Sequence, residues 1–322
     1  MSLEDEILYN LYFTTSDLDV APENMGMLVF NSQPANVSVS NADQKIDGAI
    51  ISNNMYMVST EGISGKNLAD TKYLVAYAKL DNGSYVYSSV LPYSAKSYCF
   101  DRLEKSSNAN LKSLCVAILN YGAAAQEYFA ATSDYTYTTL MNADLTAAQK
   151  ALVKAYSADM MDARGTVTAA KAGTFGTTST ATGFSGRGVT MSADGIFSIN
   201  YYFTTSTAVS DVTMYYWNAA DFASASTLTT ANATGKKTMT PSGKTNQFWA
   251  DINGIAAKDL DKAAYVTFVY SDGTTNHCGG VIGYTIGLYC KSQASKTGTL
   301  AELSKACAVY GYYAKDLFYD QV

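Results

Sequence analysis

Histidine, proline, tryptophan and charge are all scarce in this chain of 322 residues. It contains one histidine, four prolines and two tryptophans, and charged residues make up 16% of it, well below the roughly 25% of a typical soluble domain. A single imidazole excludes a histidine-rich metal site. The 22 basic and 28 acidic residues give a net charge of −6 without a basic cluster, so nucleic acid is not an expected partner.

Long hydrophobic runs are also missing. The most apolar stretch, residues 116–119, is followed at once by Asn120 and Gly122, so we expect no membrane span. The first three residues lead directly into Glu4-Asp5-Glu6, which is not the pattern of a signal peptide. If the protein is exported, we expect its leader to lie outside this sequence.

What the chain does contain is a repeat. Residues 7–16 read ILYNLYFTTS, and residues 196–206 read IFSINYYFTTS. Further matches follow in the same order, at an offset that stays near 190 residues: Gly62-Ile63 with Gly254-Ile255, Tyr98-Cys99 with Tyr289-Cys290, and Tyr121-Gly122 with Tyr310-Gly311. Self-similarity at a fixed period indicates a tandem duplication of one domain.

The duplication predicts an α+β fold with two tandem repeats, each a small antiparallel β-sandwich followed by a helical hairpin. Residues 1–132 form the first repeat, 133–164 a helical connector and 165–322 the second repeat. Residues 7–13 and 196–203 are dense in β-branched and aromatic side chains, which is typical of strands. Asn82-Gly83 and Asp272-Gly273 supply the positive φ angles that tight β-hairpin turns require.

The helical end of each copy has a clear periodicity. We expect short helices over residues 94–105 and 286–293, each followed by a long one. Apolar and small residues of the long helices recur one, three or four positions apart, along one helical face: Leu111, Leu114, Cys115, Ile118, Gly122, Ala125 and Phe129 in the first copy, and Leu300, Leu303, Ser304, Cys307, Gly311, Ala314 and Phe318 in the second. A glycine inside a helix destabilises it, so at Gly122 and Gly311 we expect a neighbour that packs too closely for a β-carbon.

The connector and the start of the second copy carry weaker signals. Thr146 and Gln149 have capping-box spacing and predict a helix running toward Asp162. Residues 165–195 are rich in Gly, Thr and Ser and should form loop and short strand. The first copy has only six residues in the corresponding place, so we expect either a smaller sandwich or a sequence that begins partway into a domain and leaves a sheet edge exposed.

Five cysteines fall into a suggestive arrangement: Cys99 and Cys115 in the first copy, and Cys278, Cys290 and Cys307 in the second. In each copy two of them, 16 or 17 residues apart, flank the junction between the predicted helices. However, Cys115 aligns with Ser304, and Cys307 aligns with Ile118 one helical turn later. Two interpretations stay open, a disulfide in each domain or small buried thiols. No Cys-x-x-Cys pair is present, so a zinc or redox motif is not indicated.

Catalytic chemistry has little support. His277 and Cys278 are adjacent on a predicted strand and would point to opposite faces, so they cannot form a dyad. A glycan hydrolase needs two suitably spaced carboxylates, and the acids in or near predicted loops are Asp17, Asp19, Asp211, Asp221 and Asp251. Neither Asp17-Leu18-Asp19 nor Asp251-Ile252-Asn253 has the glycine and distal glutamate of a full calcium loop. We therefore predict no catalytic residue, no metal and no cofactor.

Aromatic side chains offer the best case for ligand binding, because sugar rings stack on exposed Trp and Tyr. The candidates are Tyr215, Trp217 and Trp249. Against this, the internal alignment places Trp217 opposite Phe30 and Trp249 opposite Met57, which is typical of core sites of variable volume. Tyr215, Tyr216 and Trp217 are consecutive, so at least one of them must approach the surface of a strand.

The pattern Asn120-Tyr121-Gly122-Ala123-Ala124-Ala125-Gln126-Glu127-Tyr128-Phe129 resembles repeated modules in large secreted or cell-surface proteins of Gram-positive anaerobic gut bacteria. The similarity extends through residues 143–146 and back to residues 4–13; the second copy keeps only the tyrosine, glycine and alanine. The resemblance implies a secreted or surface location in a multidomain context. We predict a non-catalytic module for adhesion or structural spacing, whose partner is polysaccharide or another surface protein. Carbohydrate binding and glycan hydrolysis are the alternatives.

Overall fold

The computed structural model describes residues 1–3, 7–15, 20–52, 55–161, 171, 175, 177–178, 190–192, 197–205, 208–271 and 276–319. This part of the chain is a mixed α/β structure with open antiparallel sheets and six α-helices. It divides into two compact units, one of Met1–Lys154 with Asp316–Gln321 and one of Ala155–Lys315. We call them the first and the second unit. The division falls inside the predicted connector.

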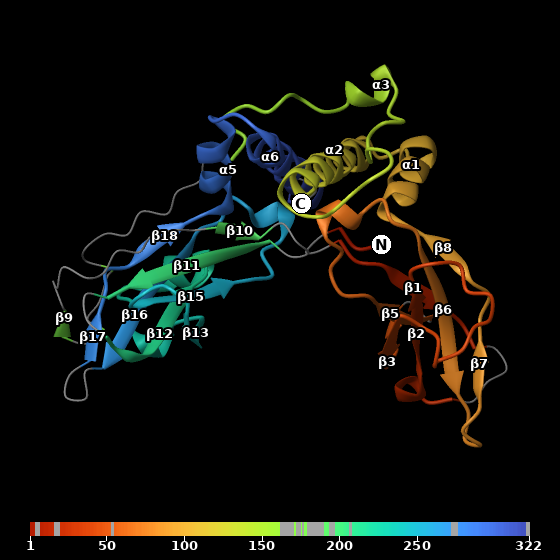
Figure 1. Cartoon of the computed structure of the whole chain (residues 1–322), viewed down its shortest axis with the longest axis horizontal. Helices are drawn as coiled ribbons and strands as arrows, with labels where there is room; N and C mark the ends of the chain where they lie inside the picture. The colour runs from red at the N-terminus through yellow and green to blue at the C-terminus, as the bar shows by residue number, and fades with distance from the viewer. Residues whose placement is uncertain are drawn as a thin grey trace. The chain divides into compact units, whose positions relative to one another are not determined.

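The first unit contains two sheets followed by helices (Figure 1). One sheet has the order β1-β5-β4, and the other has the order β3-β2-β6-β7 with β8 also paired to β6. The strands are β1 (Asn10–Phe13), β2 (Met25–Phe30), β3 (Gln44–Asp47), β4 (Ile50–Ser52), β5 (Met55–Ser59), β6 (Lys72–Lys79), β7 (Tyr85–Tyr87) and β8 (Leu91–Tyr93). The helices are α1 (Ala95–Lys105), α2 (Ala109–Thr132) and α3 (Ala147–Lys150), with 3₁₀ turns η1 (Pro22–Asn24) and η2 (Gly65–Asn67).

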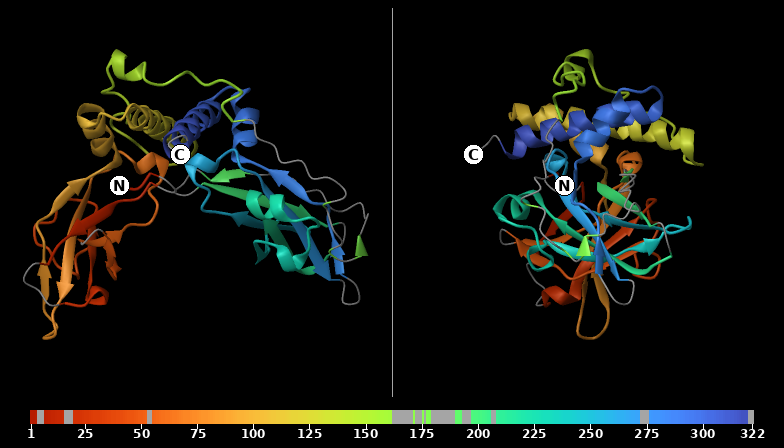
Figure 2. Two further views of the ribbon diagram at one scale, coloured as in Figure 1. Left: turned by 180° about the vertical axis from the view of Figure 1, so that it is seen from behind. Right: turned by 90° about the vertical axis from the view of Figure 1, so that its left-hand side faces the viewer.

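The second unit has sheets β10-β11-β15-β14 and β13-β12-β16-β17-β9, with β18 also paired to β16. Its strands are β9 (Thr177–Thr178), β10 (Thr190–Ser192), β11 (Ser198–Thr204), β12 (Ser210–Trp217), β13 (Gly235–Thr238), β14 (Thr240–Pro241), β15 (Gln247–Ile252), β16 (Ala264–Ser271), β17 (Asn276–Cys278) and β18 (Ile282–Tyr284). Its helices are α4 (Ala219–Ser224), α5 (Ile286–Ala294) and α6 (Thr299–Phe318), with η3 (Thr230–Asn232) and η4 (Ala257–Asp259). As in the first unit, the strands and the long helices occupy separate ends, and the views in Figure 2 agree.

Strand alternation builds the core between the two sheets of the second unit. Ile199, Tyr201 and Phe203 of β11 are buried because side chains two apart on a strand share one face. Phe203 stacks on Phe268 of β16, with ring centroids 5.0 Å apart. The two sheets therefore pack face to face through large apolar side chains.

In the first unit, buried side chains cover both faces of the sheet that contains β2 and β6. Leu28 and Phe30 are buried on one face, together with Val75 and Tyr77. Met25 and Met27 are buried on the other face. Because both faces of β2 are covered, all six of its residues are buried. A continuous apolar strand of this kind does not show the simple alternation of a half-exposed one.

The helices expected over residues 94–105 and 286–293 are present, but the helix expected after Thr146 is shorter than predicted. Ser94 forms a capping box with Ser97 at the start of α1, and Asn108 caps α2. The predicted capping box of Thr146 and Gln149 is present, yet α3 ends at Lys150. The predicted helix toward Asp162 is therefore wrong. A cap starts a helix, but propagation needs an apolar face to bury, and none of the four residues of α3 is buried.

The helix glycines pack as predicted. A β-carbon at Gly122 would collide with the side chain of Met141 and lie 3.5 Å from the carbonyl oxygen of Gly65. At Gly311 it would collide with Met161. Methionine fills such irregular gaps well because its side chain is unbranched and flexible.

The smaller sheet of the first unit has an open edge in the described part of the chain. In the second unit β10 pairs with β11, including Ser192 opposite Ser198. In the first unit, Ser2 and Leu8 form a single antiparallel bridge, and β1 is the last named strand of its sheet.

Candidate functional site

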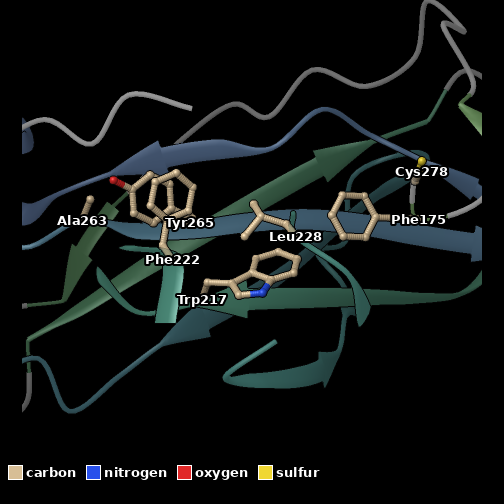
Figure 3. Packing of buried hydrophobic residues seen from close by; sticks show 7 residues of the cluster. All are labelled: Phe175, Trp217, Phe222, Leu228, Ala263, Tyr265 and Cys278. Atoms are coloured by element: carbon tan, nitrogen blue, oxygen red, sulfur yellow. The ribbon is translucent and has the colours of Figure 1, made fainter. Parts of the chain in front are cut away.

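Trp217 is a core residue of the second unit. It is fully buried in a cluster with Phe175, Phe222, Leu228 and Tyr265 (Figure 3). Its indole N–H donates a hydrogen bond to Oδ1 of Asn232, at 3.0 Å. Phe30, the residue that the internal alignment places opposite Trp217, is also buried. Because no part of the ring is exposed, Trp217 cannot stack on a sugar.

Tyr215 lies on the same face of β12 as Trp217, two residues before it. Its side chain is half-buried and packs against the Trp217 cluster. It pairs with Lys236 of β13 on one side and with Thr267 of β16 on the other. The structure therefore places Tyr215 and Trp217 in one sheet and Trp249 in the other, and does not bring the three predicted site residues together.

Trp249 is exposed, and its interpretation as a core residue is wrong. Its neighbours Phe248 and Ala250 are buried, whereas 37% of Trp249 is accessible to solvent. The cause is strand parity: Phe248 and Ala250 point into the sandwich, and Trp249 points to the outside of the β10-β11-β15-β14 sheet. Met57, which the internal alignment places opposite Trp249, is also partly exposed.

Trp249 stands at the centre of a mixed aromatic and polar surface. It lies directly opposite Tyr202 of β11 on one side and Thr240 of β14 on the other. Side chains directly opposite on neighbouring strands have β-carbons about 4.5–5.5 Å apart. We call this surface the outer face; it comprises Asn200, Tyr202, Thr204, Thr240, Gln247, Trp249 and Asp251.

Hydrogen bonds order the polar groups on both sides of the tryptophan. At one end, Nε2 of Gln247 donates to Oγ1 of Thr204 at 3.3 Å, and Oε1 of Gln247 accepts from Oγ of Ser242 at 2.8 Å. At the other end, Nζ of Lys237 lies 2.9 Å from Oδ1 of Asp251. An amide, a hydroxyl and a carboxylate are thus held beside an exposed indole. These groups suit a ligand with one apolar face and many hydroxyls.

Sequence reasoning missed Tyr202 and the polar members of this outer face. The signal was present, because Gln247-Phe248-Trp249-Ala250-Asp251 alternates between polar or amphipathic and buried positions. If Gln247, Trp249 and Asp251 are taken to share the outward face of a strand, Trp249 is predicted to lie on the surface. Its partner across the sheet follows only from the strand register.

A cavity of about 360 Å³ lies at one end of the same unit. It is lined by the end of β12, the start of α4, residues 252–256 and the start of β16, and its polar groups include Asn218, Asp259 and Lys262. These groups already have structural roles: Nζ of Lys262 lies 2.7 Å from Asp259, and Oδ1 of Asn218 accepts the α4 cap bond from the N–H of Asp221 at 2.8 Å. The cavity is therefore a weaker candidate than the outer face.

Two of the acids considered for hydrolysis have partners within the second unit. Asp251 pairs with Lys237, and Asp221 accepts a hydrogen bond from the hydroxyl of Thr234. Asp17 and Asp19 fall outside the described residues. Within the described ranges, no group of three His, Cys, Asp or Glu is arranged to hold a metal ion.

His277 and Cys278 point to opposite faces of β17, as predicted. His277 stacks on Tyr270 with ring centroids 5.0 Å apart, whereas Cys278 is buried in the Trp217 cluster. Burial raises the pKa of the Cys278 thiol, and a hydrogen bond with the backbone of Phe175 partly opposes the shift. A thiol of raised pKa is a poor nucleophile at neutral pH, so this pair does not resemble a catalytic dyad.

Comparison with known proteins adds no relative: no family model, curated protein or solved structure matches the chain. Among the helices of the described residues, none is sufficiently long and apolar to cross a membrane.

Proposed function

We propose that this chain is a non-catalytic module of a secreted or surface protein, and that the outer face of its second unit binds polysaccharide. The observation that carries the proposal is the 37% exposure of Trp249 at the centre of an ordered polar surface. Large aromatic side chains are normally buried, and an exposed tryptophan flanked by fixed hydrogen-bonding groups is what a sugar ring requires. The proposed secreted or surface location and the proposed polysaccharide binding together account for the low charge of the chain and for its resemblance to modules of surface proteins.

The outer face also fits an extended ligand better than a compact one. It is part of an open sheet rather than a closed pocket. Trp249 provides a flat apolar surface, and Gln247 and Asp251 lie on either side of it along β15. A polysaccharide chain would stack one ring on the indole and place neighbouring hydroxyls near these polar groups.

We also propose that the two units arose by duplication of one domain. In the first unit the N–H of Ile63 donates to the carbonyl of Ile7 and that of Lys96 to Leu68, at 2.7 and 3.0 Å. In the second unit the bonds from Ile255 to Phe197 and from Gly287 to Leu260 measure 3.1 and 2.8 Å. Each pair of bonds links the same elements, and the central strands pair in the same order.

The two units differ on the surface that corresponds to the outer face. The row Thr240, Trp249 and Tyr202 of the second unit corresponds to Ile50, Met57 and Tyr12 of the first. Ile50 and Tyr12 are 59% and 44% exposed. The first surface is therefore more apolar, which favours a role in adhesion to another protein or in spacing rather than in sugar binding.

The experiment is retention on immobilised polysaccharides, with Trp249→Ala and Tyr202→Ala as test variants. We expect Trp249→Ala to reduce affinity at least about tenfold, which corresponds to about 1.4 kcal/mol, and Tyr202→Ala to have a smaller effect. Tyr12→Ala is the matched control, because Tyr12 is an exposed aromatic residue at the same place in the other unit. Folding of each variant is checked by circular dichroism. Unchanged retention of folded Trp249→Ala would exclude the outer face as the sugar site.

A further inference from the structure

Four of the five cysteines meet in pairs. Cys99 of α1 and Cys115 of α2 are joined by a hydrogen bond between their side chains, and Cys290 of α5 and Cys307 of α6 are joined in the same way. All four side chains are fully buried and carry thiols. The fifth, Cys278, belongs to the Trp217 cluster. Each unit therefore holds one pair of touching thiols between its two consecutive helices.

The two thiols touch in both units, although the cysteine of the long helix occupies a different position in each. Cys115 lies seven residues before Gly122, whereas Cys307 lies four residues before Gly311. Positions three residues apart are about one helical turn apart and share a face. The place seven residues before Gly311 is taken by Ser304, whose buried hydroxyl has no hydrogen-bond partner among the described residues. If cysteine served only as a small core residue, nothing would require it to face the other cysteine from both positions.

We propose that Cys99–Cys115 and Cys290–Cys307 are disulfide sites, one in each helical hairpin, that are oxidised when the chain folds outside a reducing compartment. For its setting, this inference rests on the proposed secreted or surface location. In each reaction two thiols lose two protons and two electrons as one S–S bond forms. The oxidant is a disulfide, either of a small molecule such as oxidised glutathione or of a protein catalyst, and its own S–S bond breaks to give two thiols.

Burial determines when this reaction takes place. Removal from solvent raises the pKa of the Cys99 and Cys307 thiols well above the ordinary value. Thiolate is the attacking species in thiol–disulfide exchange, so the folded hairpin reacts slowly in either direction. The bonds form before the hairpin is covered, and in the native protein they resist reductant until the unit unfolds.

The test counts unreacted thiols in the full chain. Protein exported to an oxidising bacterial periplasm is denatured without reductant, alkylated and analysed by peptide mass mapping. We expect Cys278 alone to be alkylated, and all five cysteines to be alkylated after reduction. Cys278→Ser is the matched control and should leave no alkylated cysteine before reduction. Cys115→Ser should leave Cys99 and Cys278 alkylated while the second pair stays linked.

A second measurement covers the case in which export fails. Protein purified from a reducing cytosol is unfolded and refolded with oxidised glutathione, and its thermal midpoint is compared with that of the reduced form. A loop of about 15 residues closed by a disulfide should raise the midpoint by about 6–12 °C in a unit of this size. Alkylation of all five cysteines in the refolded protein, or linkage to partners other than those named, would overturn the proposal. Loss of polysaccharide binding alone would not, because the outer face contains no cysteine.

Discussion

The sulfur of Met141 occupies the space that a β-carbon on Gly122 would need. The terminal methyl group of Met161 fills the equivalent space beside Gly311. Both methionines come from the segment that follows α2 in the sequence. In each unit the glycine therefore forms a notch in the long helix, and a methionine side chain fills it.

Alanine at Gly311 should destabilise the protein more than alanine at Gly122. At Gly122 the obstacle is the flexible end of Met141, and alanine improves helix propensity by about 1 kcal/mol. At Gly311 the new β-carbon would also lie 3.1 Å from the carbonyl oxygen of Ala257, which belongs to the backbone and cannot turn away. We expect Gly311→Ala to cost about 1–3 kcal/mol and Gly122→Ala less, as measured by urea unfolding followed by circular dichroism.

Gly280→Ala is a suitable control for this comparison. A β-carbon at Gly280 would meet nothing within 4 Å, so its effect on the free energy of unfolding should be small. If Gly311→Ala were as stable as the wild type, the notch would be a chance feature of the packing.

Trp217→Phe should destabilise the second unit by about 1–3 kcal/mol, because it leaves a gap in the Trp217 cluster and removes the hydrogen bond to Asn232. Trp249→Phe, on the outer face, should change the free energy of unfolding by no more than about 0.5 kcal/mol. Chemical denaturation of the two variants makes the comparison. Equal costs would show that Trp217 is not the core residue described above.

Stability should fall as the pH rises above about 10. Tyr9 accepts a hydrogen bond from the N–H of Ala95 at 3.1 Å, and the hydroxyl of Tyr201 donates to the carbonyl of Ala264 at 3.1 Å. Desolvation raises the pKa of both phenols above the ordinary value, and it raises the pKa of Tyr93 to about 12. A group whose folded pKa is raised stabilises the protein below its unfolded pKa of about 10 and loses that contribution as the pH rises through the folded value.

The measurement is the thermal midpoint from about pH 8 to about pH 12, together with tyrosinate absorbance. We expect a constant midpoint at first and then a decline, in which the absorbance of the buried phenols appears together with unfolding. Tyr201→Phe removes one ionising group, so its midpoint should decline less steeply. A midpoint independent of pH over this range would contradict the burial of these phenols.

Ser304→Ala should stabilise the second unit by about 1 kcal/mol. Within the described part of the chain the buried hydroxyl of Ser304 has no hydrogen-bond partner, and removing an unsatisfied polar group recovers its desolvation cost. Ser94→Ala is the opposite control, since it removes the side chain that caps α1 and should cost about 1 kcal/mol. The denaturant midpoints of both variants test these two expectations. Destabilisation by Ser304→Ala would mean that the hydroxyl has a role in the fold.

The paired helices at the end of each copy could be predicted because their signals are local. Ser94 and Asn108 cap helices by hydrogen bonds that involve only the next few residues. Gly122 and Gly311, inside helices, predict a closely packed neighbour. The identity of that neighbour could not be predicted. Met141 and Met161 reach the notches through turns of the chain that have no regular sequence pattern.

The sheets could be predicted only in part, because a strand does not reveal which of its faces is covered. Trp217 and Trp249 both alternate with residues of the opposite face, yet one is buried and the other exposed. The difference arises from the segment containing Phe222 and Leu228, which covers Trp217. The outer face depends in addition on the register of β11 against β15, which joins residues nearly 50 positions apart.

Both tryptophans of the chain lie in the second unit, one enclosed and one in contact with solvent. Tryptophan fluorescence therefore does not report on the first unit. It reports on the second unit through two tryptophans with different surroundings. A soluble quencher should dim Trp249 first, and a bound glycan should shield it. In Trp249→Phe, the remaining emission comes from Trp217 and reports only on unfolding of the second unit. The tyrosine and peptide signals report on both units.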